Sequence, residues 1–286
     1  MSKKCIAISL AVVLVASLML LEGCTSGQEP DNGTGASSSA PVSAGPDNAF
    51  PEPDPVLPEP DPALPGDTEH DNNGTDSTAD DESHGETILL YQGHGSFRVT
   101  TAEGKVIYVD PYAGKGYDLP ADLILVTHQH SDHNNIDKIT TKNPGCEIIT
   151  EKEALADGNY QVFEFGYVVV EAVEAYNKNH KRSECVGYIL TFTDGVQIYA
   201  SGDTSATTQM KTFAARNLDY ALLCCDGVYN MDLAEASECA ASIGARHSIP
   251  YHIAPGELFS SDLAEQFEAE GRIIVAAGEE IILAGQ

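Results

Sequence analysis

The hydrophobic positions in the C-terminal two thirds of the chain follow two spacings, one typical of strands and one typical of helices. Unbroken or alternating apolar runs predict strands at 87–92, 96–100, 106–110, 123–127, 160–165, 167–173, 187–193, 196–200, 220–224, 273–275 and 281–283. Apolar residues three or four apart predict helices at 207–216, 233–243 and 262–270. This mixture indicates an α/β (α+β) domain in which sheets are flanked by helices.

The N-terminal segment 1–24 has a different pattern. Lys3 and Lys4 precede an apolar run, 6–21, that is shorter than the roughly 20 residues a membrane-spanning helix needs. We therefore predict a secretory signal, with an uncleaved anchor helix as the alternative. The sequence Leu-Glu-Gly-Cys that ends at Cys24 resembles a bacterial lipobox, although a glutamate is unusual there. The resemblance implies an extracytoplasmic protein with lipid on Cys24, or a secreted one if the lipobox is not used.

The segment 25–85 is rich in Pro, Asp, Glu, Gly, Ser, Asn and Thr, and 14 of its residues are acidic. Such a composition buries too little apolar area to offset the entropy of ordering, so we predict a disordered acidic tether. The remaining residues, 86–286, are enough for one domain with a sizeable core.

The net charge of the predicted domain limits the classes of molecule that it could bind. Residues 86–286 contain 29 acidic and 13 basic residues, a formal charge of −16 within the −29 of the whole chain. A nucleic-acid partner is disfavoured, because phosphate binding draws most of its affinity from Lys and Arg. A small-molecule substrate and, through Cys24, a membrane are the expected partners.

Five cysteines follow Cys24, namely Cys146, Cys185, Cys224, Cys225 and Cys239. An odd number without a framework spacing is poor evidence for disulfides, and adjacent cysteines on a strand point to opposite faces. We predict packed or free thiols, with metal ligands or a nucleophile as the less favoured alternatives.

The strongest chemical signal is the sequence His-Gln-His-Ser-Asp-His at 128–133, directly after the apolar run 121–127. Four of its residues can ligate metal, and nitrogen and oxygen donors of this kind favour zinc. His128 and His130 can hold one ion, while Asp132 and His133 can turn to a second ion close by.

Two close ions need ligands from other strand ends. Asp203 follows a predicted strand and Gly202, and its carboxylate could bridge both ions. His252 follows Ile-Pro-Tyr at another strand end and could complete the second set. The alternatives are a helix N-cap for Asp203 and a surface loop for His252.

The motifs at 128–133, 201–204 and 249–252, in this order, resemble the metallo-β-lactamase superfamily of metal-dependent hydrolases. Within it, the chain is most similar to small predicted zinc-dependent hydrolases that resemble the ascorbate-phosphate lactonase-like proteins. The likeness spans about residues 87–283 and none of the tether. It implies an αββα four-layer sandwich with two metal ions, expected to be Zn, at one edge.

One position departs from the superfamily pattern, which supplies a third histidine to the first ion after the strand predicted at 167–173. This chain has Asn177 there and His180 three residues later. Either His180 reaches in, or the first ion is held by His128, His130, Asp203 and water. The second case would favour a weaker site, or Mn or Fe in place of Zn.

Further residues are candidates for the pocket. His94 lies in a Gly-His-Gly turn and could line the site or serve only the turn. Asp226, Tyr229 and Asn177 follow strands and could face the substrate. Asp110 could accept a hydrogen bond from a ligand histidine, as such sites generally require.

Together these features predict a hydrolase in which a metal-activated hydroxide attacks an ester, lactone, phosphodiester or amide of a small molecule. Asp132 is the predicted catalytic residue, because it could orient the nucleophile as well as hold metal. The alternative is a tethered metal-binding or scaffold protein without turnover. The superfamily's name does not imply β-lactamase activity, because a fold does not fix a function.

Overall fold

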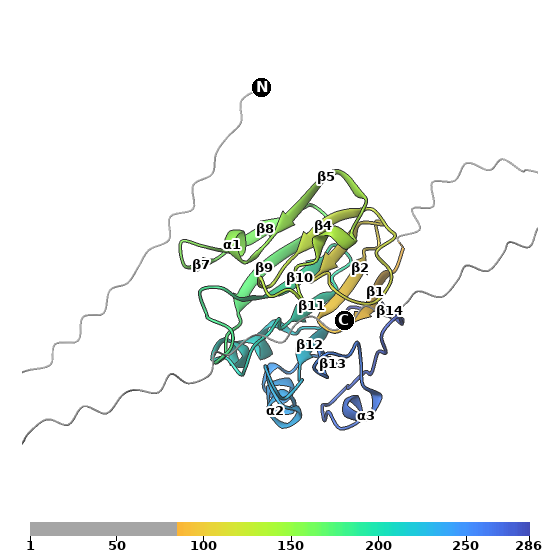
Figure 1. Cartoon of the computed structure of the whole chain (residues 1–286). Helices are drawn as coiled ribbons and strands as arrows, with labels where there is room; N and C mark the ends of the chain where they lie inside the picture. The colour runs from red at the N-terminus through yellow and green to blue at the C-terminus, as the bar shows by residue number, and fades with distance from the viewer. Residues whose placement is uncertain (1–84) are drawn as a thin grey trace, which may run out of the picture. The chain divides into compact units, whose positions relative to one another are not determined.

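Two six-stranded sheets face each other in the computed structural model, which describes residues 85–286 (Figure 1). The predicted segment 1–24, and all but the last residue of 25–85, lie outside the described residues. The first sheet has the order β14 (Glu280–Leu283), β1 (Thr87–Gly93), β2 (Ser96–Thr100), β3 (Val106–Val109), β4 (Ala121–Leu125), β5 (Lys142–Ile149). The second has the order β13 (His247–Tyr251), β12 (Tyr220–Cys224), β11 (Gln197–Ala200), β10 (Val186–Phe192), β9 (Val168–Glu174), β8 (Val162–Glu164).

The pairing directions decide which strand ends meet. In the first sheet β3, β4 and β5 are parallel, and β1 runs the same way because it is separated from β3 by the antiparallel β2. In the second sheet β11, β12 and β13 are parallel, and β9 shares their direction across the antiparallel β10. The C-terminal ends of strands β9, β11, β12 and β13 therefore lie along one edge of the second sheet.

The alternation of side chains along the first sheet explains the sandwich. Leu89, Phe97 and Ile107 face inward and belong to one buried core with the second sheet, whereas Tyr108 and Ile124 belong to a second, smaller cluster. Successive residues of a strand point to opposite faces, so both faces of this sheet are covered. The hydroxyl of Tyr188, on the second sheet, donates to the Val126 carbonyl at 3.0 Å and ties the layers together.

Short helices complete the outer layers. They are the 3₁₀ helices η1 (Ile136–Lys138) and η2 (Gln209–Arg216) and the α-helices α1 (Glu151–Ala154), α2 (Leu233–Ile243) and α3 (Ser261–Ala264). The hairpin of β6 (Leu155–Ala156) and β7 (Asn159–Tyr160) forms a separate two-stranded sheet. The outer face of the second sheet packs on η2, where Phe213 meets Tyr199 edge to face, and on α2. No helix among residues 85–286 is both long and apolar enough to span a membrane.

The predicted helix 233–243 is confirmed, and its ends follow from local chemistry. The Asp232 carboxylate caps it by accepting from the Glu235 N–H at 2.8 Å, and Gly244 ends it in the left-handed region. Both devices satisfy backbone groups that a helix end leaves unpaired.

Two other helix predictions are wrong in type or length. The segment predicted at 207–216 is 3₁₀ from Gln209, where the Thr212 hydroxyl donates to the Gln209 carbonyl at 2.7 Å. The helix predicted at 262–270 ends at Ala264. Beyond it the Arg272 guanidinium donates to the carbonyls of Glu265 and Phe267, which gives them partners outside a helix.

The strand prediction at 273–275 is also wrong, because the chain there makes only an isolated bridge between Ser248 and Arg272. Strand β5 was not predicted, since Asn-Pro-Gly interrupts its pattern. The residues 160–165 form two short strands in place of one, with Tyr160 paired to Leu155 and Val162 paired to Glu171.

Candidate metal centre

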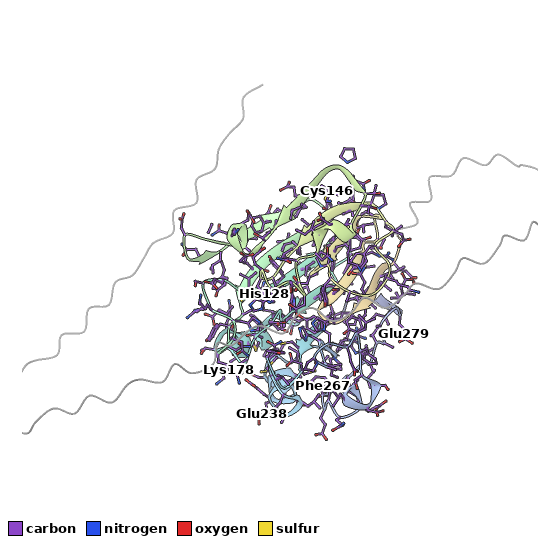
Figure 2. All side chains as sticks on the ribbon, in the orientation of Figure 1. His128, Cys146, Lys178, Glu238, Phe267 and Glu279 are labelled. Atoms are coloured by element: carbon purple, nitrogen blue, oxygen red, sulfur yellow. The ribbon has the colours of Figure 1, made fainter. Side chains whose placement is uncertain are left out.

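All seven residues predicted to bind metal come together, because the strands that precede them end at the same place. His128, His130, Asp132 and His133 follow β4, His180 follows β9, Asp203 follows β11 and His252 follows β13. Figure 2 labels His128, which is buried, in the interior of the domain, and Lys178 on the loop after β9 at its surface. The four segments that carry these residues are far apart in sequence and converge through the sheet topology.

Asp203 lies at the middle of this cluster. Its Oδ2 is 3.3 Å from His180 Nε2, 3.6 Å from His252 Nε2 and 4.0 Å from His128 Nε2. Its Oδ1 is 3.4 Å from His133 Nε2. A Cβ on Gly202 would lie 2.7 Å from the Val186 carbonyl oxygen, so only glycine lets the chain bring Asp203 this close.

The ligand atoms form overlapping groups in which all members lie within 4.8 Å of one another. One group is His128, His130 and His180, a second is His128, His133 and Asp203, and a third is His94, Asp132, His133 and His252. The first and third groups share no residue, and Asp203 lies against members of both. This arrangement suits two neighbouring cations with a carboxylate between them.

The donor atoms themselves fit a metal better than they fit one another. His128 Nε2, His133 Nε2, His252 Nε2 and Asp203 Oδ1 are buried and have no hydrogen-bond partner within the described residues. A buried polar atom without a partner is costly, about 1–3 kcal/mol each. Imidazole nitrogens and a carboxylate that are buried together and unpaired are the donor set that zinc prefers.

The surroundings of His128, His130 and His252 favour the neutral imidazole, which is the form that binds a metal. Burial lowers the pKa of His128 and of His130, and the other imidazoles nearby lower both pKa values further. Burial likewise lowers the pKa of His252, against the opposing pull of Asp203. These imidazoles are therefore neutral near pH 7, and the neutral ring is the ligand form.

The carboxylates and His133 show the opposite balance. Burial raises the pKa of Asp203, but His252 and His133 outweigh it and hold the pKa well below its usual range. For Asp132, burial is likewise outweighed by His94 and His133, so its pKa is lowered. Burial lowers the pKa of His133, but the charges of Asp203 and Asp110 raise it well above its usual value. Both carboxylates are therefore ionised, and the raised pKa lets His133 carry a proton that a bound cation would displace.

Asp110 orients His133 from behind. Its Oδ2 lies 2.8 Å from His133 Nδ1 and accepts from the Thr127 hydroxyl at 2.6 Å, while its Oδ1 accepts from the Thr127 N–H at 2.7 Å. Nδ1 thereby carries the hydrogen and Nε2 is left for a metal. The sequence predicts this role for Asp110, whose φ of 47° turns the chain out of β3.

Asn177 does the same for His180. Its Oδ1 accepts from the His180 N–H at 3.0 Å and lies 2.9 Å from His180 Nδ1. Its Nδ2 donates to the Tyr229 carbonyl and to Asn230 Oδ1, at 3.0 and 3.1 Å. His180 is therefore aimed at Asp203 by the residue that stands where the superfamily's third histidine is expected.

The loop 226–230 connects this support to the other half of the site. Asp226 Oδ2 accepts from Asn230 Nδ2 at 2.7 Å and lies 3.4 Å from His252 Nδ1, an electrostatic contact without hydrogen-bond geometry. Asp226 is buried, so it faces His252 and not a substrate. Tyr229 is half exposed and remains a candidate for substrate contact.

We expect Asn177→Ala to weaken binding of the ion held by His180 by about 10–100-fold, the usual cost of losing a residue that orients a ligand. The change leaves two donors of His180 without an acceptor. Metal titration of the purified protein would measure it, with Asn179→Ala as the matched control, because Asn179 Nδ2 donates only to the Tyr229 carbonyl. Equal loss in both variants would contradict this role.

A polar cleft borders the His128, His130 and His180 group. It is lined by His128, Gln129, His130, Glu151, Asn179, His180, Lys181, Glu184 and Cys185. Gln129 Nε2 donates to Glu151 Oε2 at 2.6 Å, and Lys181 pairs with Glu184 at 2.9 Å. Glu151 was not predicted as a site residue; its only signal is its position directly after a parallel strand.

The five cysteines among the described residues are free, and none of them is placed as a nucleophile. Burial raises the pKa of Cys185, in the cleft wall, to about 12, so its thiol is neutral. Figure 2 labels Cys146 on the edge strand β5, well away from His128.

Comparison with known proteins identifies the family to which the chain belongs. Residues 88–252 match the domain family described as the beta-lactamase superfamily domain. The chain belongs to the metallo-β-lactamase superfamily. A UPF0173 metal-dependent hydrolase of Nitratidesulfovibrio vulgaris is 30% identical over 193 residues, which cover 58% of this chain and 80% of that protein.

Solved structures agree on the fold of this metallo-β-lactamase superfamily member. A crystal structure from Parabacteroides distasonis is 28% identical with a TM-score of 0.55, over 66% of this chain and 92% of that one. Igni18, a metallo hydrolase from Ignicoccus hospitalis, is 20% identical with a TM-score of 0.58, over 70% and 99%. The predicted sandwich fold and the predicted class, a hydrolase of the metallo-β-lactamase fold, are confirmed.

Proposed function

We propose that the protein is a dizinc hydrolase of small molecules. His128, His130 and His180 would hold the first ion, Asp132, His133 and His252 the second, and Asp203 would contact both. The observation that carries the proposal is the set of buried, unpartnered ligand atoms around Asp203. Nitrogen donors with few carboxylates favour zinc over Mg²⁺ or Ca²⁺, while Mn or Fe remain compatible with the set.

When bound, zinc would supply Lewis acidity, lowering the pKa of water toward 7 and polarising a carbonyl or phosphoryl oxygen. The chain's own residues prepare the site for this. Asp110 and Asn177 fix the tautomers of His133 and His180 before any substrate arrives. Asp132, whose side chain is one third exposed, presents a carboxylate that can orient an attacking water.

The cleft indicates a polar substrate. Its wall includes Gln129, Asn179, Lys181 and two glutamates, so it offers both donors and acceptors of hydrogen bonds to a substrate. An ester, a lactone, a phosphodiester or an amide of a small molecule would fit this chemistry. A lactone belongs in the set because the sequence resembles the ascorbate-phosphate lactonase-like proteins.

The purified protein is expected to hydrolyse at least one member of a panel of phosphodiester, lactone, thioester, amide and β-lactam compounds. A chelator should abolish that activity and added Zn²⁺ should restore it, because the metal supplies the Lewis acid of the reaction. A rate that the chelator leaves unchanged would contradict the proposal. The alternative of a non-catalytic scaffold rested on a doubtful third ligand and on the long acidic tether; the position of His180, 3.3 Å from Asp203 Oδ2, argues against the first of these grounds.

We also propose that the protein is extracytoplasmic and attached to a bacterial membrane through lipid on Cys24, with 25–85 as a tether. The support is the lipobox-like sequence and the acidic, Pro-rich composition after it. Cys24→Ala is expected to move the protein from the membrane fraction to the soluble fraction or to block its processing. Unchanged fractionation and mass of the mature chain would contradict the lipid anchor.

A further inference from the structure

We infer that His94 is a further ligand of the second ion, an inference that rests on the proposed dimetal site. His94 lies in the turn between β1 and β2, and the superfamily motifs at 128–133, 203 and 252 do not include it. One of its ring nitrogens falls within 4.8 Å of the ligand atoms of Asp132, His133 and His252. With Asp203 shared between the two ions, His94 would be the fifth protein ligand of the second ion and its third imidazole.

The turn holds His94 rigidly in an unfavourable conformation. Its φ is 54°, in the left-handed region that most residues avoid. Its N–H donates to the Leu258 carbonyl at 2.7 Å, while its carbonyl accepts from the His252 N–H at 2.9 Å and the Tyr91 hydroxyl at 2.8 Å. Strain that the surroundings maintain at this cost is characteristic of functional positions.

Hydrogen bonding fixes the tautomer of the His94 ring. Nδ1 is 3.3 Å from the Glu257 carbonyl oxygen, which can only accept, so Nδ1 carries the hydrogen. Nε2 then presents a lone pair to Asp132 Oδ2, which is 3.1 Å away. Two lone pairs at that distance repel unless a positive centre lies between them.

The neighbouring atoms indicate that the positive centre is a cation. His133 Nε2 and His252 Nε2 are buried without hydrogen-bond partners and converge on the same point. The His94 and His252 rings are in contact, with centroids 3.8 Å apart, so both rings lie next to the place where the ligand atoms converge. A proton on His94 would satisfy Asp132 alone, whereas a metal ion would satisfy all four groups.

The glycine after His94 shows that the turn is built against this site. A Cβ on Gly95 would lie 2.6 Å from His133 Cε1, closer than packed atoms allow. His133 is fully buried and held from behind by Asp110, so it could not move aside. The Gly-His-Gly sequence therefore brings one imidazole in and makes room for another.

The test compares zinc binding by the metal-free wild type with that of H94N and H94Q, by titration and elemental analysis. Asparagine tolerates the left-handed conformation but is too short to reach the ion, and glutamine can donate to Asp132 but ligates zinc poorly. Both variants should bind the first ion normally and the second more than about 100-fold more weakly, beyond the usual cost of losing a residue that only orients a ligand. His247→Ala, at the other end of β13, should bind both ions like the wild type.

Wild-type affinity for the second ion in H94Q would show that His94 only orients Asp132. Wild-type affinity in both variants would show that His94 has no part in the site. Either result would overturn this inference and leave the proposed function standing. A wild type that binds no second ion would defeat the proposed function as well. If the variants fail to fold, Co²⁺-loaded wild type decides. Its NMR spectrum should contain shifted N–H signals from six coordinated imidazoles. Five signals would overturn the inference.

Discussion

Asp203→Asn is expected to lower chelator-sensitive hydrolysis and the affinity for both ions by well over 100-fold, beyond the loss of a residue that only orients a ligand. The substitution keeps the size of the side chain and removes its charge. That charge lies within 4.0 Å of four imidazole nitrogens, from His128, His133, His180 and His252. Because Asp203 contacts both halves of the site, its loss should affect both ions together.

Elemental analysis of the purified variant and its rate on the best substrate of the panel would measure this effect. Asp137→Asn is the matched control, because Asp137 is exposed in η1, only four residues after His133. The control should bind metal like the wild type. An Asp203→Asn variant that keeps two ions and full activity would show that the carboxylate does not bridge them.

Asp110→Ala is expected to lower the free energy of unfolding by roughly 3 kcal/mol or more. The carboxylate is buried and accepts from the Thr127 N–H, the Thr127 hydroxyl and the ring of His133. Each buried donor left without an acceptor costs about 1–3 kcal/mol, and the Thr127 hydroxyl can turn toward His128. The second ion should also bind less tightly, because His133 loses its orientation.

Urea unfolding of the metal-free proteins separates the two effects of Asp110→Ala, since it measures stability without the ion. Asp118→Ala serves as the control. Asp118 is largely exposed, so solvent screens its ion pair with Arg98 at 3.5 Å and the pair is worth little. A wild-type midpoint for Asp110→Ala would show that the Asp110 hydrogen bonds contribute nothing to the fold.

The sequence predicted most of the sheet because apolar alternation is a local signal. The strands 87–92, 96–100 and 220–224 differ from the observed ones by at most one residue. The helix prediction at 262–270 went wrong because the partner that takes its carbonyls, Arg272, lies outside the segment. Strand β5 was missed because its pairing with β4 overrides a Pro-Gly pair that normally breaks a strand.

The candidate site shows the same difference between residues that local sequence indicates and residues that depend on distant contacts. The motif at 128–133 is continuous and was visible at once, and strand ends pointed to Asp203 and His252. The direction of His180 was left open, because it depends on hydrogen bonds to Asn177 and on a loop about 50 residues further along the chain. The tautomer of His94 depends on the Glu257 carbonyl, 163 residues away, which no local pattern can indicate.

The metal content of the purified protein tests the central claim most directly. We expect elemental analysis after reconstitution with Zn²⁺ to give two ions per chain, with a melting temperature that falls when a chelator removes them, because a ligand that binds only the folded state stabilises it. His128→Ala should bind less metal. No bound metal after reconstitution, together with an unchanged melting temperature in His128→Ala, would contradict the assignment of this cluster as a metal centre.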